Sequence, residues 1–168
     1  TNVWANTMTV AGPALTVTTL AYPASRSIPA PTSDFVFATF SFDASSSGED
    51  INVTSITVTD SAGGAAAAAE YGYINNAELW ADLTDATSER GDIYETKISD
   101  TEQPSASTSG AVDTTAFVLN QTLTIPKGSF KKVALVADLD SSATVSHTFY
   151  ITTSGVTATG ANTGESAS

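Results

Sequence analysis

The feature that most constrains this chain is the kind of side chain at the polar positions of its alternating segments. Over much of the sequence, aliphatic and aromatic residues alternate with Thr or Ser, and seldom with Lys, Glu or Arg. Such alternation, rich in β-branched residues, indicates half-buried antiparallel strands. Helical periodicity is almost absent, so the crossover helices of a parallel α/β fold have no candidate segments.

The alternation also predicts which residues face the core. In segment 51–58 the apolar parity changes between Val53 and Ile56, which predicts a β-bulge at Thr54–Ser55. Segment 34–43 places Phe35 and Phe37 on one face and a second apolar set on the other, namely Val36, Ala38, Phe40 and Phe42. Two later strands are expected to bury Ala77, Leu79, Ala81 and Leu83, and Val133, Leu135, Ala137 and Leu139.

Turn signals separate these strands. Pro126-Lys127-Gly128 predicts a tight turn with Pro in its second position and Gly in its fourth. The run 65–70, five Ala and a Glu, predicts either a short helical turn or a small-residue loop. Segment 142–154 is expected to be the last clear strand, and 155–168 a polar C-terminal extension or linker.

Strand number and spacing define the expected architecture. Eight to ten short strands with turn signals between them predict an all-β fold, a single antiparallel β-sandwich domain spanning residues 1–168. A closed barrel is the competing all-β solution. A chain of 168 residues buries roughly 70% of its unfolded surface, so it needs neither disulfide nor metal for stability.

Charge and composition exclude several classes of function. The formal net charge is -12 and only six residues are Lys or Arg, which argues against nucleic acid as a partner. No apolar run reaches the roughly 20 residues that span a membrane, so no membrane insertion is expected. The absence of Cys suits either an extracellular bacterial protein or any other cysteine-poor protein. The low charged fraction with abundant Ser, Thr and Ala is typical of surface-exposed bacterial β-proteins, so a cell-surface setting is expected.

Several phrases of the sequence resemble a known kind of module. Asn6–Val10 followed by Leu15–Val17, then Glu49–Val58, and later Ile125–Gly128 followed by Val133–Leu139, resemble repeated Ig-like β-sandwich domains. Those domains belong to large surface proteins of candidate-phyla bacteria. The resemblance implies an Ig-like sandwich and structural work at a cell surface, as in S-layer, adhesin or appendage subunits, with no reaction catalysed.

The N-terminal segment 1–11 is a candidate donor or linking strand. Trp4, Met8 and Val10 form one apolar stripe in a segment too short to have a core of its own. That stripe packs either in its own sandwich or in the groove of another copy by strand addition. The expected partners are therefore copies of this chain.

The single histidine, His147, is the only candidate for the base of a Ser-His-Asp triad. No Gly-x-Ser-x-Gly motif accompanies it, so a strand histidine with a satisfied hydrogen-bond partner is the favoured interpretation. A glycosidase needs two facing carboxylates, whose spacing the sequence does not give. No catalytic residue is therefore assigned, and the chain is not expected to be an enzyme.

Carboxylates near turns are the candidate metal ligands. Calcium takes six to eight oxygen ligands, so clusters of Asp and Glu in loops are compatible with it. The candidates are Asp43, Glu49, Asp50, Asp138 and Asp140. No EF-hand pattern occurs, and solvated turn residues are the alternative. No other cofactor is expected.

Three further features carry weaker predictions. Trp80 faces outward by parity, so it either stacks on surface glycans, with Tyr71, Tyr73 and Tyr94 beside it, or covers a sheet edge. Asn52 and Asn120 begin glycosylation sequons, which also arise by chance in Thr-rich chains. Lys97 is the strand lysine available for an internal isopeptide bond.

The function expected from all these observations is a self-associating structural module, with a carbohydrate-binding or adhesive module as the alternative.

Overall fold

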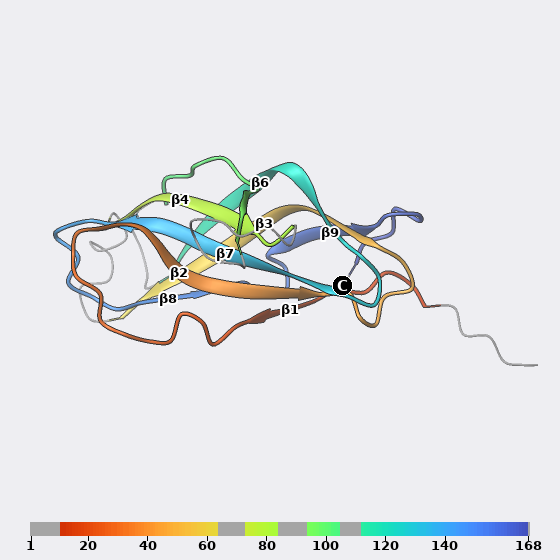
Figure 1. Ribbon diagram of the computed structural model, residues 1–168, viewed down its shortest axis with the longest axis horizontal. Helices are drawn as coiled ribbons and strands as arrows, with labels where there is room; N and C mark the ends of the chain where they lie inside the picture. The colour runs from red at the N-terminus through yellow and green to blue at the C-terminus, as the bar shows by residue number, and fades with distance from the viewer. Residues whose placement is uncertain (1–10, 64–72, 84–93, 105–111, 168) are drawn as a thin grey trace, which may run out of the picture.

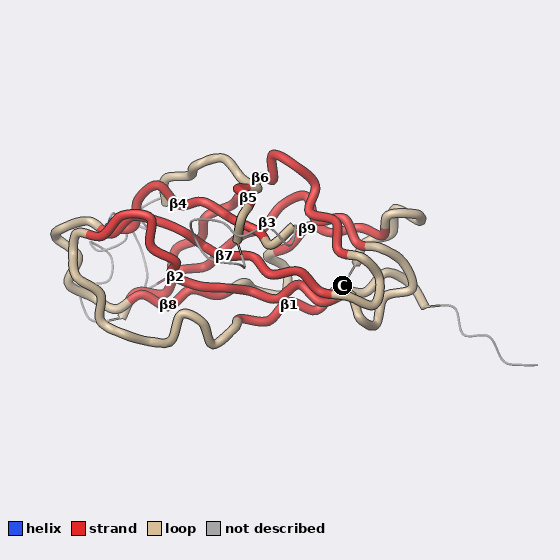
Figure 2. The backbone as a smooth tube through the Cα atoms, in the orientation of Figure 1, coloured by secondary structure: helices blue, strands red, loops and turns tan. Residues whose placement is uncertain are grey.

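The computed structural model describes residues 11–63, 73–83, 94–104 and 112–167. Figure 2 shows these residues as strands and loops, in agreement with the all-β prediction. The strands of the described residues are β1 (Thr16–Thr19), β2 (Thr32–Asp43), β3 (Ile51–Ala62), β4 (Ile74–Ala81), β5 (Thr96–Lys97), β6 (Val112–Ile125), β7 (Phe130–Leu139), β8 (His147–Tyr150) and β9 (Val156–Gly160). Segment 65–70, where a helical turn was one prediction, lies outside the described residues.

The strands form two antiparallel sheets, as expected for a sandwich (Figure 1). The first, sheet A, has the order β1-β2-β7-β4-β5. The second, sheet B, has β6 and β8 on either side of β3, and β9 also pairs with β3. The inner faces bury aromatic and aliphatic side chains that include Phe40, Phe42 and Phe117, all 0% exposed. A β-sandwich rather than a closed barrel is therefore the architecture.

Strand β3 contains the predicted bulge. Its pairing shifts between Val53 and Ser55 against both of its neighbours, β6 and β9. Against β9 the extra residue is Thr54 of β3, whereas against β6 the extra residues, 119–122, belong to β6. Ile51, Val53, Ile56 and Val58 all reach the core, where each is at most 2% exposed. The parity change in the sequence is thus confirmed as a bulge.

A second bulge, in β2, was not predicted, and it corrects the expected faces of that strand. Pairing with β7 shifts between Val36 and Ala38, so the alternation restarts after Phe37. Phe37 therefore packs against the main core, whereas Val36 packs on the other face of sheet A, against Tyr94 and Val136. The prediction that Val36 shares a face with Ala38 and Phe40 was wrong because strict alternation does not survive an inserted residue.

The outer face of sheet A is partly covered. Val133, Leu135, Ala137 and Leu139 of β7 face the main core as predicted, and Ala77, Leu79 and Ala81 of β4 do the same. The alternate β7 residues Ala134 and Val136 are also buried, under Tyr94, which is 2% exposed. Strand β7 is thus buried on both faces because the segment that begins at Tyr94 returns over it.

The C-terminal part of the chain differs from the prediction of a polar extension. Val156–Gly160 forms β9, which pairs with Ile51–Ile56 of β3 over the half that β8 leaves free. Gly160 and Ala167 donate backbone bonds to Glu165 and Ala158, so the following turn folds back on β9. Alternation in Val-Thr-Ala-Thr-Gly was the signal that pointed to a strand there.

The hairpin turn between β6 and β7 forms, one residue later than predicted. Ser129 donates to the carbonyl of Pro126 (3.1 Å), so Pro126 is the first residue of the turn and Lys127 and Gly128 are its centre. Gly128 has φ of 75°, which suits a type II turn and favours glycine.

Candidate functional site

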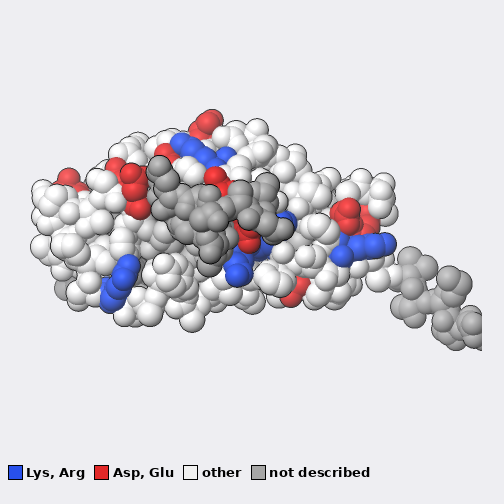
Figure 3. Space-filling model, in the orientation of Figure 1, with Lys and Arg blue, Asp and Glu red and all other residues white. Residues whose placement is uncertain are grey.

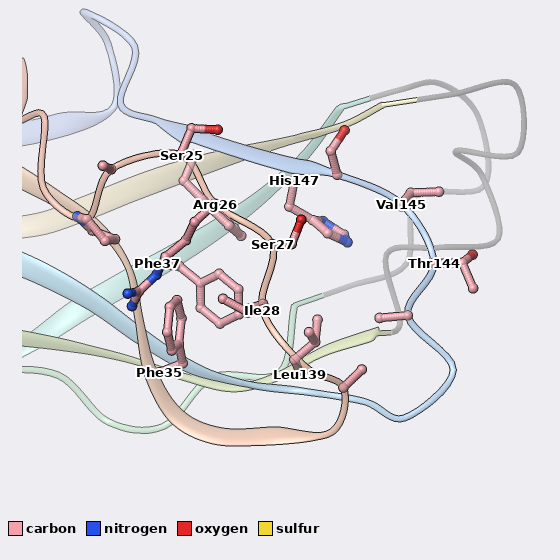
Figure 4. A pocket seen from close by; sticks show the side chains of 16 residues that line it. Ser25, Arg26, Ser27, Ile28, Phe35, Phe37, Leu139, Thr144, Val145 and His147 are labelled. Atoms are coloured by element: carbon pink, nitrogen blue, oxygen red, sulfur yellow. The ribbon is translucent and has the colours of Figure 1, made fainter.

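The candidate site is a cavity of about 450 Å³ at the end of the sandwich where β2 begins (Figure 4). It lies between Phe35 and Phe37 of β2 and the segment that leads into β8. Residues 23–30 form a further wall, where Pro23 and Pro29 keep the chain out of the sheet. The cavity therefore occupies the open edge between the two sheets, beside the single histidine.

His147 is held in this cavity from two sides. Its Nδ1 atom lies 2.8 Å from Oδ2 of Asp60 on the neighbouring strand β3, and its side chain is 5% exposed. Its ring stacks on that of Phe149, with the centroids 6.2 Å apart and the planes 14° apart. These two contacts fix the position and the orientation of the imidazole.

A second carboxyl group lies beside this pair. Asp113 of β6 is the direct cross-strand partner of Asp60, and both residues follow the inward parity of Val58 and Phe117. Burial raises the pKa of the Asp113 carboxyl, and nearby Asp60 raises it further, although the Thr114 amide lowers it by donating to Oδ1 (2.8 Å). Oδ1 of Asp60 and Oδ2 of Asp113 are buried and have no hydrogen-bond partner among the residues that the structure describes.

The histidine prediction is confirmed on one side of the ring only. Nδ1 has the partner that a strand histidine needs, whereas Nε2 is buried and has no hydrogen-bond partner within the described ranges. A serine nucleophile would have to bond to Nε2, and none among the described residues does so. The arrangement is therefore an Asp-His pair beside a cavity and not an assembled triad.

The first group of predicted calcium ligands is occupied by other contacts. Asp43 accepts from the amide of Ser45 (2.7 Å), and Asp50 accepts from that of Lys127 (2.8 Å). Glu49 is 6% exposed and binds the C-terminal turn: Oε2 accepts from the amides of Asn162 (2.6 Å) and Thr163 (3.0 Å), and Oε1 from the Thr163 hydroxyl (2.6 Å). These bonds, that of the Thr163 hydroxyl first, lower the pKa of Glu49.

The second group is similarly engaged. Asp138 accepts from the amide of Asp34 (2.8 Å) and from the side chain of Asn76 (2.7 Å). Asp140 accepts from the amide and hydroxyl of Ser142 at 2.8 and 2.7 Å, which lower its pKa. Within the described ranges, no cluster of three or more His, Asp or Glu is arranged to hold a metal ion. Asp43, Asp50 and Asp140 accept from turn amides, as the alternative to calcium expected. Asp138 instead joins β2 to β4, and Glu49 is buried and not solvated. Calcium binding at these carboxylates stays a prediction.

The proposed aromatic platform is not assembled around Trp80. Trp80 is half-buried and packs with Tyr94 on the outer face of sheet A, and its Nε1 donates to Oε2 of Glu78 (3.0 Å). Tyr94 is almost fully buried, which removes it from a stacking surface. Tyr73 is half-buried, and Tyr71 lies outside the described residues. Trp80 thus packs on the outer face of sheet A over β4, which lies between β7 and β5, and not at a sheet edge as the alternative interpretation had it.

The remaining predictions concern the isopeptide lysine, the two glycosylation sequons and the N-terminal apolar stripe. Lys97 pairs with Glu78 (2.7 Å) with its side chain 33% exposed, so it lacks the burial that an isopeptide bond requires. Asn52 is half-buried and accepts from the Thr124 hydroxyl (2.9 Å), and Asn120 is exposed on β6. Trp4, Met8 and Val10 lie outside the described residues.

The outer face of sheet B is a feature that the sequence reasoning missed. Residues directly opposite in an antiparallel pair share a face, so the ladders define this surface. Its described members are Asn52, Ser55, Thr57, Thr59, Ser61, Val112, Thr114, Ala116, Val118, Thr124, Thr148, Tyr150, Thr157 and Thr159. None is charged, while the charged groups of these strands, Asp60, Asp113 and His147, point inward.

Comparisons with known proteins give no relative. No family model, no curated protein and no solved structure matches the chain. Among the described residues, no helix is long and apolar enough to cross a membrane.

Proposed function

We propose that this chain is a non-enzymatic structural module of an extracellular assembly and that it binds other copies of itself. The observation that supports the proposal most directly is the charge-free outer face of sheet B. The chain carries a net charge of -12, yet the described residues of that face are Thr, Ser, Asn, Ala, Val and Tyr.

The electrostatic argument starts from repulsion between copies. Like charges brought together at an interface cost several kcal/mol, so strongly acidic copies approach best through a surface without carboxylates. The outer face of sheet A does not qualify, because it bears Lys132, Asp138 and the Glu78–Lys97 ion pair. Figure 3 shows such charged groups in small clusters separated by uncharged surface.

The uncharged face also has an apolar component. Val118 and Val112 of β6 are 73% and 46% exposed, and β6 is an edge strand of sheet B. Exposed apolar groups on a long edge strand favour association with another chain. The Thr hydroxyls around them both donate and accept hydrogen bonds, so a second copy of the same face satisfies them.

The N-terminal segment 1–11 is a second proposed contact. Its stripe of Trp4, Met8 and Val10 supports strand addition to another copy. The Cys-free, Thr-rich composition supports a cell-surface location, in a filament or a surface layer.

Charge insertion tests the uncharged face. Thr57→Glu and Thr114→Glu each add a carboxylate to neighbouring strands of sheet B, and Thr18→Glu adds one to the exposed outer strand β1 of sheet A as a matched control. We expect light scattering and negative-stain microscopy to show assembly by the wild type and the control, and monomers for the first two variants. Assembly unchanged in both sheet B variants, or a wild type that stays monomeric, would contradict the proposal.

Deletion of residues 1–11 distinguishes the contact made by the N-terminal segment from that made by the uncharged face of sheet B. Loss of long polymers with retention of small oligomers is expected if the N-terminal segment joins copies end to end. Normal polymers formed by the deleted chain would exclude strand addition while leaving the uncharged face in place.

A further inference from the structure

The unpaired nitrogen of His147 is the starting point. Side chains that are buried without a hydrogen-bond partner are rare in folded proteins, and each requires an explanation, such as an absent ligand. Nε2 of His147 is buried and has no hydrogen-bond partner in the part of the chain that the structure describes, although the side chain is held on its other sides by Asp60 and Phe149. The ring is therefore positioned but incompletely satisfied.

The partner of Nδ1 determines what Nε2 offers. A carboxylate oxygen only accepts hydrogen bonds, so the neutral ring carries its proton on Nδ1, toward Asp60. Nε2 then presents a lone pair. A ligand that satisfies it has to donate a hydrogen bond, as a hydroxyl group does.

The cavity provides the rest of a binding site. Its volume of about 450 Å³ is within the range of ligand pockets, roughly 300–1,000 Å³. One wall is aromatic: the rings of Phe35 and Phe37 meet edge to face at 5.1 Å, and Phe37 lies 5.4 Å from Phe149. Ser27 lines the cavity and is exposed, so the cavity is open to solvent and solutes on this side. Figure 4 shows the side chains of His147, Ser27 and Phe37 around this space.

Charge selects among ligands with hydroxyl groups. Asp60 and Asp113 lie behind His147 and disfavour an anion near its ring. The one cation that lines the cavity among the described residues, Arg26, already lies over the face of Phe35, 5.0 Å from the ring centroid. A neutral ligand with several hydroxyls and one apolar face fits this combination.

We propose that the cavity binds the terminal sugar of a neutral carbohydrate. Because Arg26 already lies over the face of Phe35, the sugar would place the C–H groups of one ring face against Phe37. One of its hydroxyls would donate to Nε2 of His147. The hydroxyls of Ser27 and its neighbours provide further hydrogen bonds. This site lies at the open edge between the sheets, apart from the uncharged outer face of sheet B, and it does not depend on self-association.

Because the chain has a single histidine, ¹⁵N NMR of its side chain reports on the site without ambiguity. Glucose, galactose, mannose and N-acetylglucosamine would each be titrated to millimolar concentration. At least one is expected to shift the Nε2 resonance in a saturable manner. Failure of all four to move it would overturn the proposal, whatever the outcome of the assembly experiments.

Three variants locate the binding. Ser27→Trp fills the cavity from an exposed position and is expected to abolish binding, while Ser154→Trp makes the same change at an exposed serine outside it and should leave binding unchanged. His147→Phe keeps the aromatic ring, removes Nε2 and should weaken binding about tenfold. Binding that survives Ser27→Trp, or that is lost in Trp80→Phe instead, would place the sugar elsewhere and refute the assignment.

Discussion

Replacement of Asp113 by Asn should make the protein more stable at neutral pH. Asp113 and Asp60 are direct cross-strand partners, and each has a buried carboxylate oxygen without a hydrogen-bond partner. Asn keeps the oxygen that accepts from the Thr114 amide and removes one of the two like charges.

The magnitude follows from the cross-strand geometry. Like charges directly opposite in a sheet destabilise it by roughly 0.2–1 kcal/mol. The larger value corresponds to a rise of about 2–4 °C in Tm for a chain of this size. Thermal unfolding followed by circular dichroism measures it, with Asp100→Asn as the control, because Asp100 is exposed.

The pH dependence gives a sharper test of the same reasoning. The pKa of Asp113 is raised in the folded protein, so its charge costs stability at neutral pH and that cost disappears as the pH falls below the ordinary Asp range. The gain from Asp113→Asn should therefore be present at pH 7 and absent in acid. A fall in Tm at pH 7, or a gain equal at both pH values, would refute the electrostatic interpretation.

Three other substitutions test separate parts of the fold. Glu49→Gln should speed hydrogen exchange at the amides of Asn162 and Thr163. The pKa of Glu49 is lowered in the folded state, so the stability that its carboxylate contributes is present above the ordinary Glu pKa and is lost as the pH falls. The stabilities of wild type and variant should therefore converge in acid. Phe117→Ala should cost about 3–5 kcal/mol in urea unfolding, since Phe117 is 0% exposed; a loss below 1 kcal/mol would show a looser core than the structure has. Gly128→Ala should cost about 1 kcal/mol, because Gly128 has φ of 75°; an unchanged Tm would mean that the turn relaxes.

The core of this protein is largely readable from its sequence. Alternation identified the buried residues of β3, β4 and β7, and a single change of parity located the bulge at Thr54. These predictions succeed because the side chains of a strand alternate between two faces, and one of them is buried.

The errors have a common physical origin in contacts between distant segments. The β2 bulge that reverses Val36 involves pairing with β7, about a hundred positions later. The burial of Tyr94 and Trp80 depends on where the chain returns over sheet A. Alternation describes one strand at a time and carries no information about which segment covers its other face.

In the candidate site, too, the sequence predicted which residues matter but not which distant residues they contact. His147 and the carboxylates were identified by residue type, but residue type does not tell that His147 meets Asp60, 87 positions away. Glu49 was proposed as a metal ligand because it lies in an acidic turn, and its partners, Asn162 and Thr163, are more than a hundred residues downstream.

The corner at residues 48–50 holds both ends of the folded body. Gly48 donates to the carbonyl of Gly12, Glu49 accepts from Asn162, and Ala161 donates to the carbonyl of Asp50. A pulling force applied at residues 12 and 162 would therefore act at one pole and open β1 and β9, each on the edge of its sheet, pair by pair from their ends. Under tension the two edge strands would therefore separate one residue pair at a time, and the hydrogen bonds of β3 would not have to break simultaneously in shear. A polypeptide that enters and leaves the domain at this pole would carry the whole domain as a side branch, because its two attachment points lie close together.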